Sequence, residues 1–249
     1  MAFLLFLAGV AGGIVNAVAG GATLITFPAM LAAGLPPIVA NASNAVAISP
    51  GHLIAALADR EKLPPFDRLL ALALATAVVG GIIGALLLLA LPDRLFVLPV
   101  PALIGFATLL FAFAPQIQAW AERRRNGAAP SAAGGLAALA AASVYGGFFG
   151  AGLGVILTAV LSIAAPNDIR KVKALKNLLA TGVSLAAIGI FVFQGVVQWR
   201  ETAFMLAGAL LGGYAGGHLV RTLPAKIVRG FVIVAGAAMT IVYAQRYWL

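Results

Sequence analysis

The chain alternates between long apolar runs and short polar breaks, and the apolar runs predict helices that span a membrane. Residues 1–58 contain no Asp, Glu, Lys or Arg, and similar uncharged runs cover 69–92, 95–121 and 127–167. A helix needs about 20 apolar residues to cross the hydrocarbon core of a bilayer. The pattern therefore predicts an all-α polytopic membrane protein.

The pattern of small and polar residues repeats at an offset of 132 positions. A GGxxG motif at 80–84 returns at 212–216, and the Leu-Pro pair that ends the first of these segments returns at the same offset. Self-similarity at one fixed offset indicates a duplicated architecture. It predicts a first transmembrane repeat at 1–115, a cytoplasmic linker at 116–132 and a second repeat at 133–249.

Each repeat divides into apolar segments that predict the individual helices. In each repeat the first two segments meet at a glycine-rich break, and the second segment is short for a full crossing. The first repeat gives segments at about 2–19, 22–33, 39–58, 69–91 and 95–114, and the second at about 133–150, 153–165, 174–194, 202–220 and 226–246.

The positions of the basic residues predict how the two repeats are oriented. If the first two segments of each repeat form a hairpin, the repeats are inverted, and all of the 16 Lys and Arg residues except Arg94, Arg200 and Arg246 fall on one side. A parallel arrangement divides the same residues equally. Because cytoplasmic loops collect Lys and Arg, we expect inverted-topology repeats with both termini outside the cytoplasm.

Charge and cysteine content limit the partners and the kinds of site that this protein can have. The net charge of +9 could indicate nucleic-acid binding, but only 9% of the residues are charged and the basic ones lie between apolar runs. That placement is typical of loops that orient a membrane protein, so we expect a lipid bilayer and no nucleic acid as partner. The chain has no cysteine, which excludes disulfides, thiolate metal sites and thiol catalysis.

The glycine-rich breaks are candidate binding sites for an anion. The stretch GGIVNAVAGGATLITFP at 12–28 interrupts an apolar run, and GGFFGAGLGVILT at 146–158 is its counterpart. Inverted repeats with broken helices are a recurrent plan of secondary transporters, and a half-helix that begins inside the membrane presents free N–H groups to an anion. Close helix packing is the alternative role, and we favour it for the GGxxG motifs. The candidate residues here are Asn16, Gly20, Gly21, Thr23, Gly152 and Gly154.

The third segment of each repeat adds polar candidates. Asn41, Asn44, Ser49 and His52 fall on one face of a helix at 100° per residue, as expected for a helix with one wet side. A Pro-Gly pair at 50–51 is expected to kink this helix. Asn41 and Asn44 are candidate ligands, and His52 is a candidate for proton coupling, with a hydrogen-bonded packing role as the alternative.

Lys176 and Asn177 are the corresponding candidates in the second repeat. Lys176 matches Asn44 at the offset of 132. Lys176 either begins a helix at the cytoplasmic interface or turns inward with Asn177 to meet an anion, and a buried lysine in a membrane marks a functional site.

The acidic residues all lie in or beside the expected loops. A cation transporter or a metal site normally uses a carboxylate within the membrane, so we expect no metal, no cofactor and an anion as substrate. Ser49 and His52 share a helix face, but no G-x-S-x-G motif or acidic orienting residue accompanies them, which argues against an intramembrane enzyme.

The residues that carry these features resemble the TauE/SafE family of membrane transporters, known as sulfite exporters. The resemblance rests on GGIVNAVAGGATLITFPAMLAAGLPPIVANASN at 12–44, on GGFFGAGLG at 146–154 and on KALKN at 173–177, and it extends over almost the whole chain. It implies a multi-pass carrier in the cell inner membrane that exports a small inorganic or organosulfur anion.

The expected function is therefore the export of sulfite by alternating access, with the anion held at the half-helix N-termini where the repeats meet. Uptake or exchange of an organic sulfonate or carboxylate such as sulfoacetate, and an anion channel, remain open alternatives, as does a homodimer. An anion that leaves a cell with a negative interior gains about 2.3 kcal/mol per charge per 100 mV, which favours export.

Overall fold

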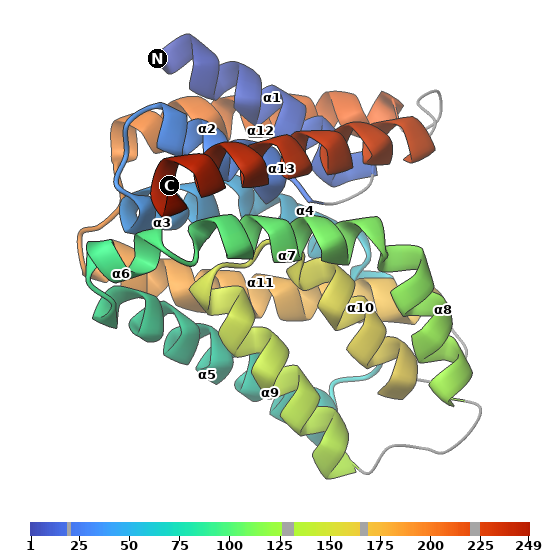
Figure 1. Ribbon diagram of the computed structural model, residues 1–249. Coiled ribbons are helices and arrows are strands. Elements are labelled where there is room, and N and C mark those ends of the chain that lie inside the picture. Colours follow the sequence, from blue (N-terminus) through green and yellow to red (C-terminus); the bar gives the residue numbers. More distant parts are fainter. Residues whose placement is uncertain (19–20, 126–131, 165–168, 220–224) are drawn as a thin grey trace.

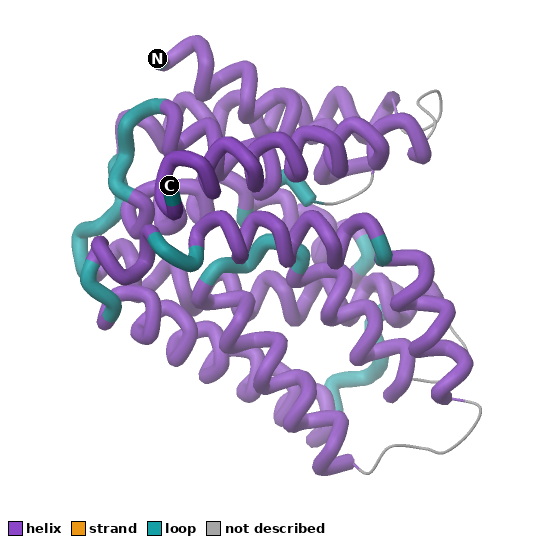
Figure 2. The backbone as a smooth tube through the Cα atoms, viewed as in Figure 1, coloured by secondary structure: helices purple, strands orange, loops and turns teal. Residues whose placement is uncertain are grey.

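Helices form all the regular structure that is described, which confirms the all-α prediction. The computed structural model describes residues 1–18, 21–125, 132–164, 169–219 and 225–249. Figures 1 and 2 show the helices packed side by side, with several of them joined by short loops.

The helix bounds follow the predicted apolar segments closely, except that three predicted segments are divided or extended. The first half contains α1 (Ala2–Val18), α2 (Thr23–Ala32), α3 (Pro37–Ile48), α4 (Pro50–Ala58), the short 3-10 helix η1 (Arg60–Lys62), α5 (Arg68–Ala90), α6 (Asp93–Val97), α7 (Val100–Ala112) and α8 (Ala114–Arg125). The second half contains α9 (Ala132–Phe148), α10 (Leu153–Ala164), α11 (Ile169–Phe193), α12 (Trp199–Leu219) and α13 (Ala225–Trp248).

The third segment is broken in the first half and continuous in the second. α3 ends at Ile48 and α4 begins at Pro50, where the sequence predicts a kink. Proline lacks the N–H that a helix interior needs, so it is tolerated in the first turn of a new helix. The matching α11 has no proline and continues as one helix from Ile169 to Phe193.

Three helices of the described residues are long and apolar enough to cross a membrane: Arg68–Ala90 in α5, Arg170–Phe193 in α11 and Lys226–Trp248 in α13. α7 and α8 count as a fourth span if they are taken together, but they are bent by 62°. α1, α2, α9 and α10 are apolar but shorter, as expected for segments that meet at a break inside the membrane.

The two glycine-rich breaks form the tips of two helical hairpins, α1–α2 and α9–α10. Gly21 has φ +88° at the first tip, and Gly150 and Gly152 have φ +77° and +79° at the second. These are left-handed backbone conformations that glycine adopts without strain. In Figure 1, α1 starts on the left, where both chain termini lie. α9 starts at the bottom of the view and runs from there toward the left.

Helices of one half pack mainly against helices of the other. The two most extensive pairs are α1 with α12 and α5 with α9, and α5 with α11 and α7 with α13 follow. The offset of 132 takes α1 to α9 and α5 to α12, so it exchanges the two most extensive pairs, and it leaves the α7–α13 pair in place. Two copies related by a two-fold axis would pack in this way.

Gly80 and Gly84 lie at the α5–α9 contact and Gly212 and Gly216 at the α1–α12 contact, in the packing role that the sequence favours for the GGxxG motifs. A Cβ on Gly212 would overlap the carbonyl oxygen of Val10 in α1, and a Cβ on Gly84 would overlap that of Val144 in α9. Small residues let helix backbones approach this closely, which is a common basis of helix association in membranes.

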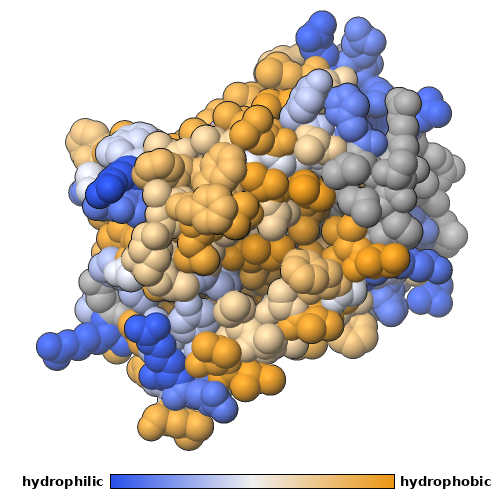
Figure 3. Space-filling model, turned by 90° about the horizontal axis from the view of Figure 1, so that it is seen from above, coloured by the Kyte–Doolittle hydropathy of each residue, from blue (hydrophilic) through white to orange (hydrophobic). Residues whose placement is uncertain are grey.

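Apolar side chains cover the outside of the bundle between two polar ends. Phe3, Leu87, Phe106, Phe231 and Ile241 are among the large apolar residues that are exposed. Figure 3 shows one face of the molecule, with apolar side chains across its middle and polar ones gathered towards both ends. This distribution fits a protein whose apolar middle region is surrounded by lipid.

Candidate functional site

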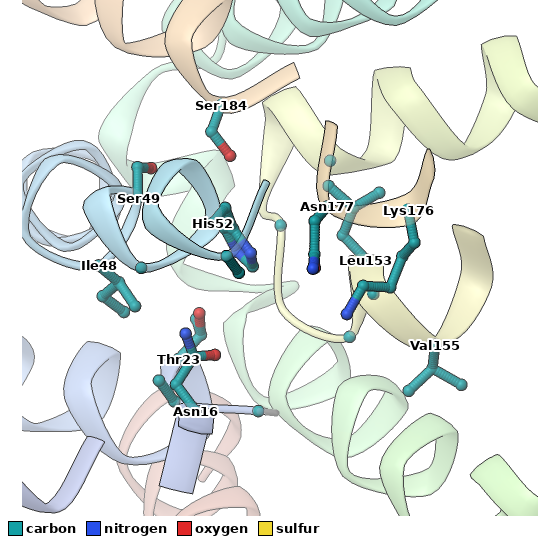
Figure 4. Close-up of a pocket in the computed structure, with 18 of the residues that line it drawn as sticks. Asn16, Thr23, Ile48, Ser49, His52, Leu153, Val155, Lys176, Asn177 and Ser184 are labelled. Carbon is teal, nitrogen blue, oxygen red and sulfur yellow. The ribbon is translucent and has the colours of Figure 1, made fainter. Parts of the chain in front are cut away.

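A cavity of about 1200 Å³ opens between the two hairpin tips and the third helices of the two halves. Its wall includes the start of α2, the face of α3 and α4 that carries the polar residues, the α9–α10 tip and the first turns of α11. α8, α12 and α13 complete it. Figure 4 shows several of the polar residues that line it.

The first hairpin places Asn16, Gly21 and Thr23 on the cavity wall. Asn16 lies on α1, and its Nδ2 is 2.9 Å from the position that a Cβ on Gly51 would take, so its amide touches the start of α4. Gly20, the remaining candidate of this hairpin, lies outside the described residues.

α3 contributes Asn41 and Asn44, and both are almost fully buried. Asn41 Nδ2 donates to the carbonyl oxygen of Phe148, 3.0 Å away in the second hairpin. Asn44 is 2% exposed, and its Oδ1 has no hydrogen-bond partner among the described residues. A buried polar atom without a partner is uncommon. The unpaired atom is an acceptor, which leaves the Nδ2 group of Asn44 as the donor of this side chain.

The second hairpin brings Gly152 and Gly154 to the cavity at the start of α10. The side chain of Lys176 passes over this helix start, because its Cδ is 3.9 Å from the position that a Cβ on Gly154 would take. Figure 4 shows the Lys176 ammonium directed toward the turn that precedes α10. Lys176 therefore turns inward, which was one of the two orientations that the sequence left open.

Asn177 and His52 face the same space from opposite sides. Asn177 follows Lys176 on α11, His52 lies in the first turn of α4, and both line the cavity. Figure 4 shows the His52 ring and the Asn177 amide coming from two different helices.

Several residues on the cavity wall were not predicted as site residues. They are Phe111, Gln118, Glu122, Thr158, Ser162, Ser184, Tyr214, Lys226 and Arg229, with Asp59 and Lys173. From the sequence alone, Lys226 and Arg229 belong with the basic residues that set the orientation of the two repeats in the membrane. Arg229, however, lies one turn inside the apolar segment predicted at 226–246, and a charge inside an apolar segment is a signal of function.

The electrostatics of the cavity favour a negatively charged guest. Four cations line it, Lys173, Lys176, Lys226 and Arg229, against two acids, Asp59 and Glu122. Asp59 is already paired with Lys62, and this is the one ion pair found among the described residues.

The start of α10 adds to this positive field. The N-terminus of a helix carries about half a positive charge, so this helix start and the Lys176 ammonium both contribute positive charge to the same part of the cavity wall. Within the described part of the chain, no group of three or more His, Asp or Glu side chains is arranged to hold a metal ion.

Comparison with known proteins places the chain among membrane transporters. The family model of the sulfite exporter TauE/SafE matches residues 5–243. A probable membrane transporter protein of Haemophilus influenzae is 28% identical over 247 residues, which cover 98% of this chain and 96% of the relative. The probable membrane transporter protein YfcA of Escherichia coli K12 is 28% identical over 95% of this chain and 87% of its own length.

A third relative extends over the whole chain. The probable membrane transporter protein ORF9 of a Sinorhizobium species is 28% identical over 100% of this chain and 96% of its own length. No solved structure matches the chain.

Proposed function

Because this chain belongs to the sulfite exporter TauE/SafE family, we propose that it exports a small sulfur oxyanion, sulfite above all, from the cytoplasm by alternating access. The chain is a membrane transporter and not an enzyme, as are its named relatives. The substrate, the direction and the mechanism are the proposal. The anion is held at the start of α10 by backbone N–H groups and by Lys176. The side-chain amides of Asn16 and Asn44, from the first half, line the other side of the cavity.

The convergence of Lys176 on the start of α10 carries this proposal. The lysine and the helix start are both positive, and they meet in a cavity with an excess of cations. Such an arrangement is unfavourable when empty, and a bound anion relieves it. The neutral amides of Asn16, Asn44 and Asn177 are suited to hydrogen bonding with the oxygens of an oxyanion.

Export requires that the cavity can be loaded from the cytoplasm, and the position of the basic residues supports this. We propose two inverted repeats, 1–115 and 133–249, in the cell inner membrane, with both termini outside the cytoplasm. Asp59, Glu122 and Lys226 line the cavity, and they lie beside the loops that carry most of the Lys and Arg residues. Since such loops are cytoplasmic, the cavity is expected to open to the cytoplasm.

An organic sulfonate such as sulfoacetate is the second candidate substrate, and the size of the cavity favours it. A volume of about 1200 Å³ is far larger than a four-atom oxyanion needs, since pockets of about 300–1,000 Å³ hold drug-sized ligands. Ile48, Leu153 and Phe149 offer apolar contacts on the same wall. A carbon body could lie against them while the sulfonate meets Lys176.

Transport by purified protein in liposomes tests the function. Liposomes loaded with radiolabelled sulfite are diluted into buffer with a potential that draws anions out, and protein-free liposomes serve as the control. We expect protein-dependent release that saturates with sulfite and shows counterflow, as a carrier does. Release of sulfoacetate without release of sulfite would move the proposal to the second substrate. Transport of neither anion would contradict it.

A further inference from the structure

Arg229 binds the backbone at the bend between α7 and α8. Its Nη2 donates to the carbonyl oxygens of Phe111, at 2.8 Å, and Ala112, at 2.9 Å. Its guanidinium carbon lies 5.8 Å from the centre of the Phe111 ring. A cation at the C-terminus of a helix is favourable both electrostatically and as a donor to carbonyls that the helix leaves free.

The sequence explains why the Phe111 carbonyl lacks its usual helical donor. In a continuous helix, the carbonyl of Phe111 would accept from the N–H of residue 115, but that residue is Pro115, which has none. The proline ring also crowds the carbonyl four residues earlier. α7 therefore ends at Ala112 and α8 starts again at Ala114 after the 62° bend. Arg229 donates to the carbonyls at this bend.

The last turn of α7 touches both hairpin tips. A Cβ on Gly21 would lie 3.0 to 3.4 Å from three atoms of the Phe111 ring, so the ring packs directly on the first tip. A Cβ on Gly152 would lie 3.3 Å from Leu110 Cδ1, so the neighbouring residue packs on the second tip. The last turn of α7 therefore packs against Gly21 in the first tip and against Gly152 in the second.

We propose that Arg229 is a positioning residue for the anion site. By fixing the end of α7 at the bend, it holds Phe111 and Leu110 against the two glycine tips and sets the angle of α8, whose Gln118 and Glu122 line the cavity. This role rests on the proposed transport function and extends it, because it assigns the geometry of the site to a residue that need not contact the anion.

Lys226 provides a matched control for the charge of Arg229. It lies on the same helix, one turn earlier, and lines the same cavity. It forms no hydrogen bond or ion pair within the described residues. If Arg229 acted only by attracting anions, neutralising either residue would have the same consequence.

Sulfite transport by three variants separates the two roles. Arg229→Gln is expected to lower the maximal rate at least tenfold, because the carbonyls of Phe111 and Ala112 lose the hydrogen bonds that Arg229 Nη2 donates. Arg229→Lys should restore part of that rate, since an ammonium donates to the same carbonyls. Lys226→Gln should raise KM severalfold at low salt with little change in maximal rate. Equal effects of Arg229→Gln and Lys226→Gln, both removed by salt, would overturn the proposal.

A distance measurement tests the positioning without relying on transport. The absence of native cysteine allows spin labels at Ala119→Cys on α8 and Val234→Cys on α13, two exposed positions. We expect Arg229→Gln to shift or broaden the distance distribution and Lys226→Gln to leave it unchanged. An unchanged distribution in Arg229→Gln would overturn the proposal even if transport fell. A broadened distribution in a protein that moves no sulfite would retain the positioning of the bend and refute the transport function.

Discussion

Asn41 on α3 donates a hydrogen bond from Nδ2 to the carbonyl oxygen of Phe148, 3.0 Å away, across 107 residues of sequence. The bond joins the polar helix of the first half to the last residue of α9, next to the tip of the second hairpin. Asn41 is 3% exposed, so this contact is shielded from solvent. The hairpin tip that presents Gly152 and Gly154 is therefore held in part by the other half of the chain.

Replacing Asn41 by Ala should loosen this tip. The partly buried carbonyl of Phe148 would lose this donor, which costs up to about 1–3 kcal/mol, and sulfite transport should fall with it. Ser43→Ala is the control, because Ser43 is buried on the same helix and accepts from the Gln198 N–H at 3.0 Å, but does not line the cavity. Thermal unfolding in detergent and liposome flux measure the two effects. Equal loss of transport in both variants would show that stability alone is responsible.

The second hairpin tip should tolerate alanine at one glycine and not at the other. Gly152 has φ +79°, and a residue with a Cβ pays about 1–2 kcal/mol for that left-handed conformation. A Cβ on Gly154 would make only an ordinary contact with Lys176. Gly152→Ala should therefore lower the unfolding midpoint, and Gly154→Ala should leave it within about 0.5 kcal/mol of the unmodified protein. The reverse order would contradict the hairpin geometry.

Lys176 is expected to dominate the affinity for the anion. Loss of a charged hydrogen bond costs about 1.5–3 kcal/mol, so Lys176→Gln should weaken sulfite binding roughly 10-fold to 100-fold. Lys176→Arg should retain part of the affinity. The control is Lys173→Gln, because Lys173 lies nearly one turn earlier and is exposed on the same wall. Isothermal titration calorimetry in detergent measures the affinity for sulfite. A similar loss of affinity in both Gln variants would show that the two lysines act only through the general positive charge of the cavity, and that Lys176 is not a direct ligand.

The inverted topology predicts which exposed positions each side of the membrane can reach. Single cysteines at Phe66 and Ala119 should react with an impermeant thiol reagent from the cytoplasmic side, and those at Gln194 and Leu249 from the outside. All four positions are exposed in the structure. Labelling of Ala119→Cys and Leu249→Cys from the same side would contradict the arrangement of the two halves.

Much of the fold could be predicted because apolar periodicity and glycine breaks act locally. The segment predicted at 69–91 is α5 at Arg68–Ala90, and the short segment at 153–165 is α10 at Leu153–Ala164. The kink expected at residues 50–51 is the boundary between α3 and α4. In each case a residue type that ends or starts a helix lies at the boundary itself.

The bend between α7 and α8 could not be predicted in the same way. Pro115 interrupts the helix, but the direction of the following helix depends on Arg229, more than 100 residues later. The inward orientation of Lys176 also depends on where α10 lies. Both are tertiary relationships, and a single sequence carries no signal for the distance between α7 and α13 or between α10 and α11.

The position of a bound oxyanion tests the central claim most directly. Selenite is a close chemical analogue of sulfite, and its selenium atom gives anomalous X-ray scattering, so a crystal soaked in selenite would locate the anion. The account predicts one anomalous peak at the start of α10, beside Gly152 and Gly154 and within hydrogen-bond reach of Lys176 Nζ. A peak elsewhere in the cavity, away from both the helix start and Lys176, would contradict it.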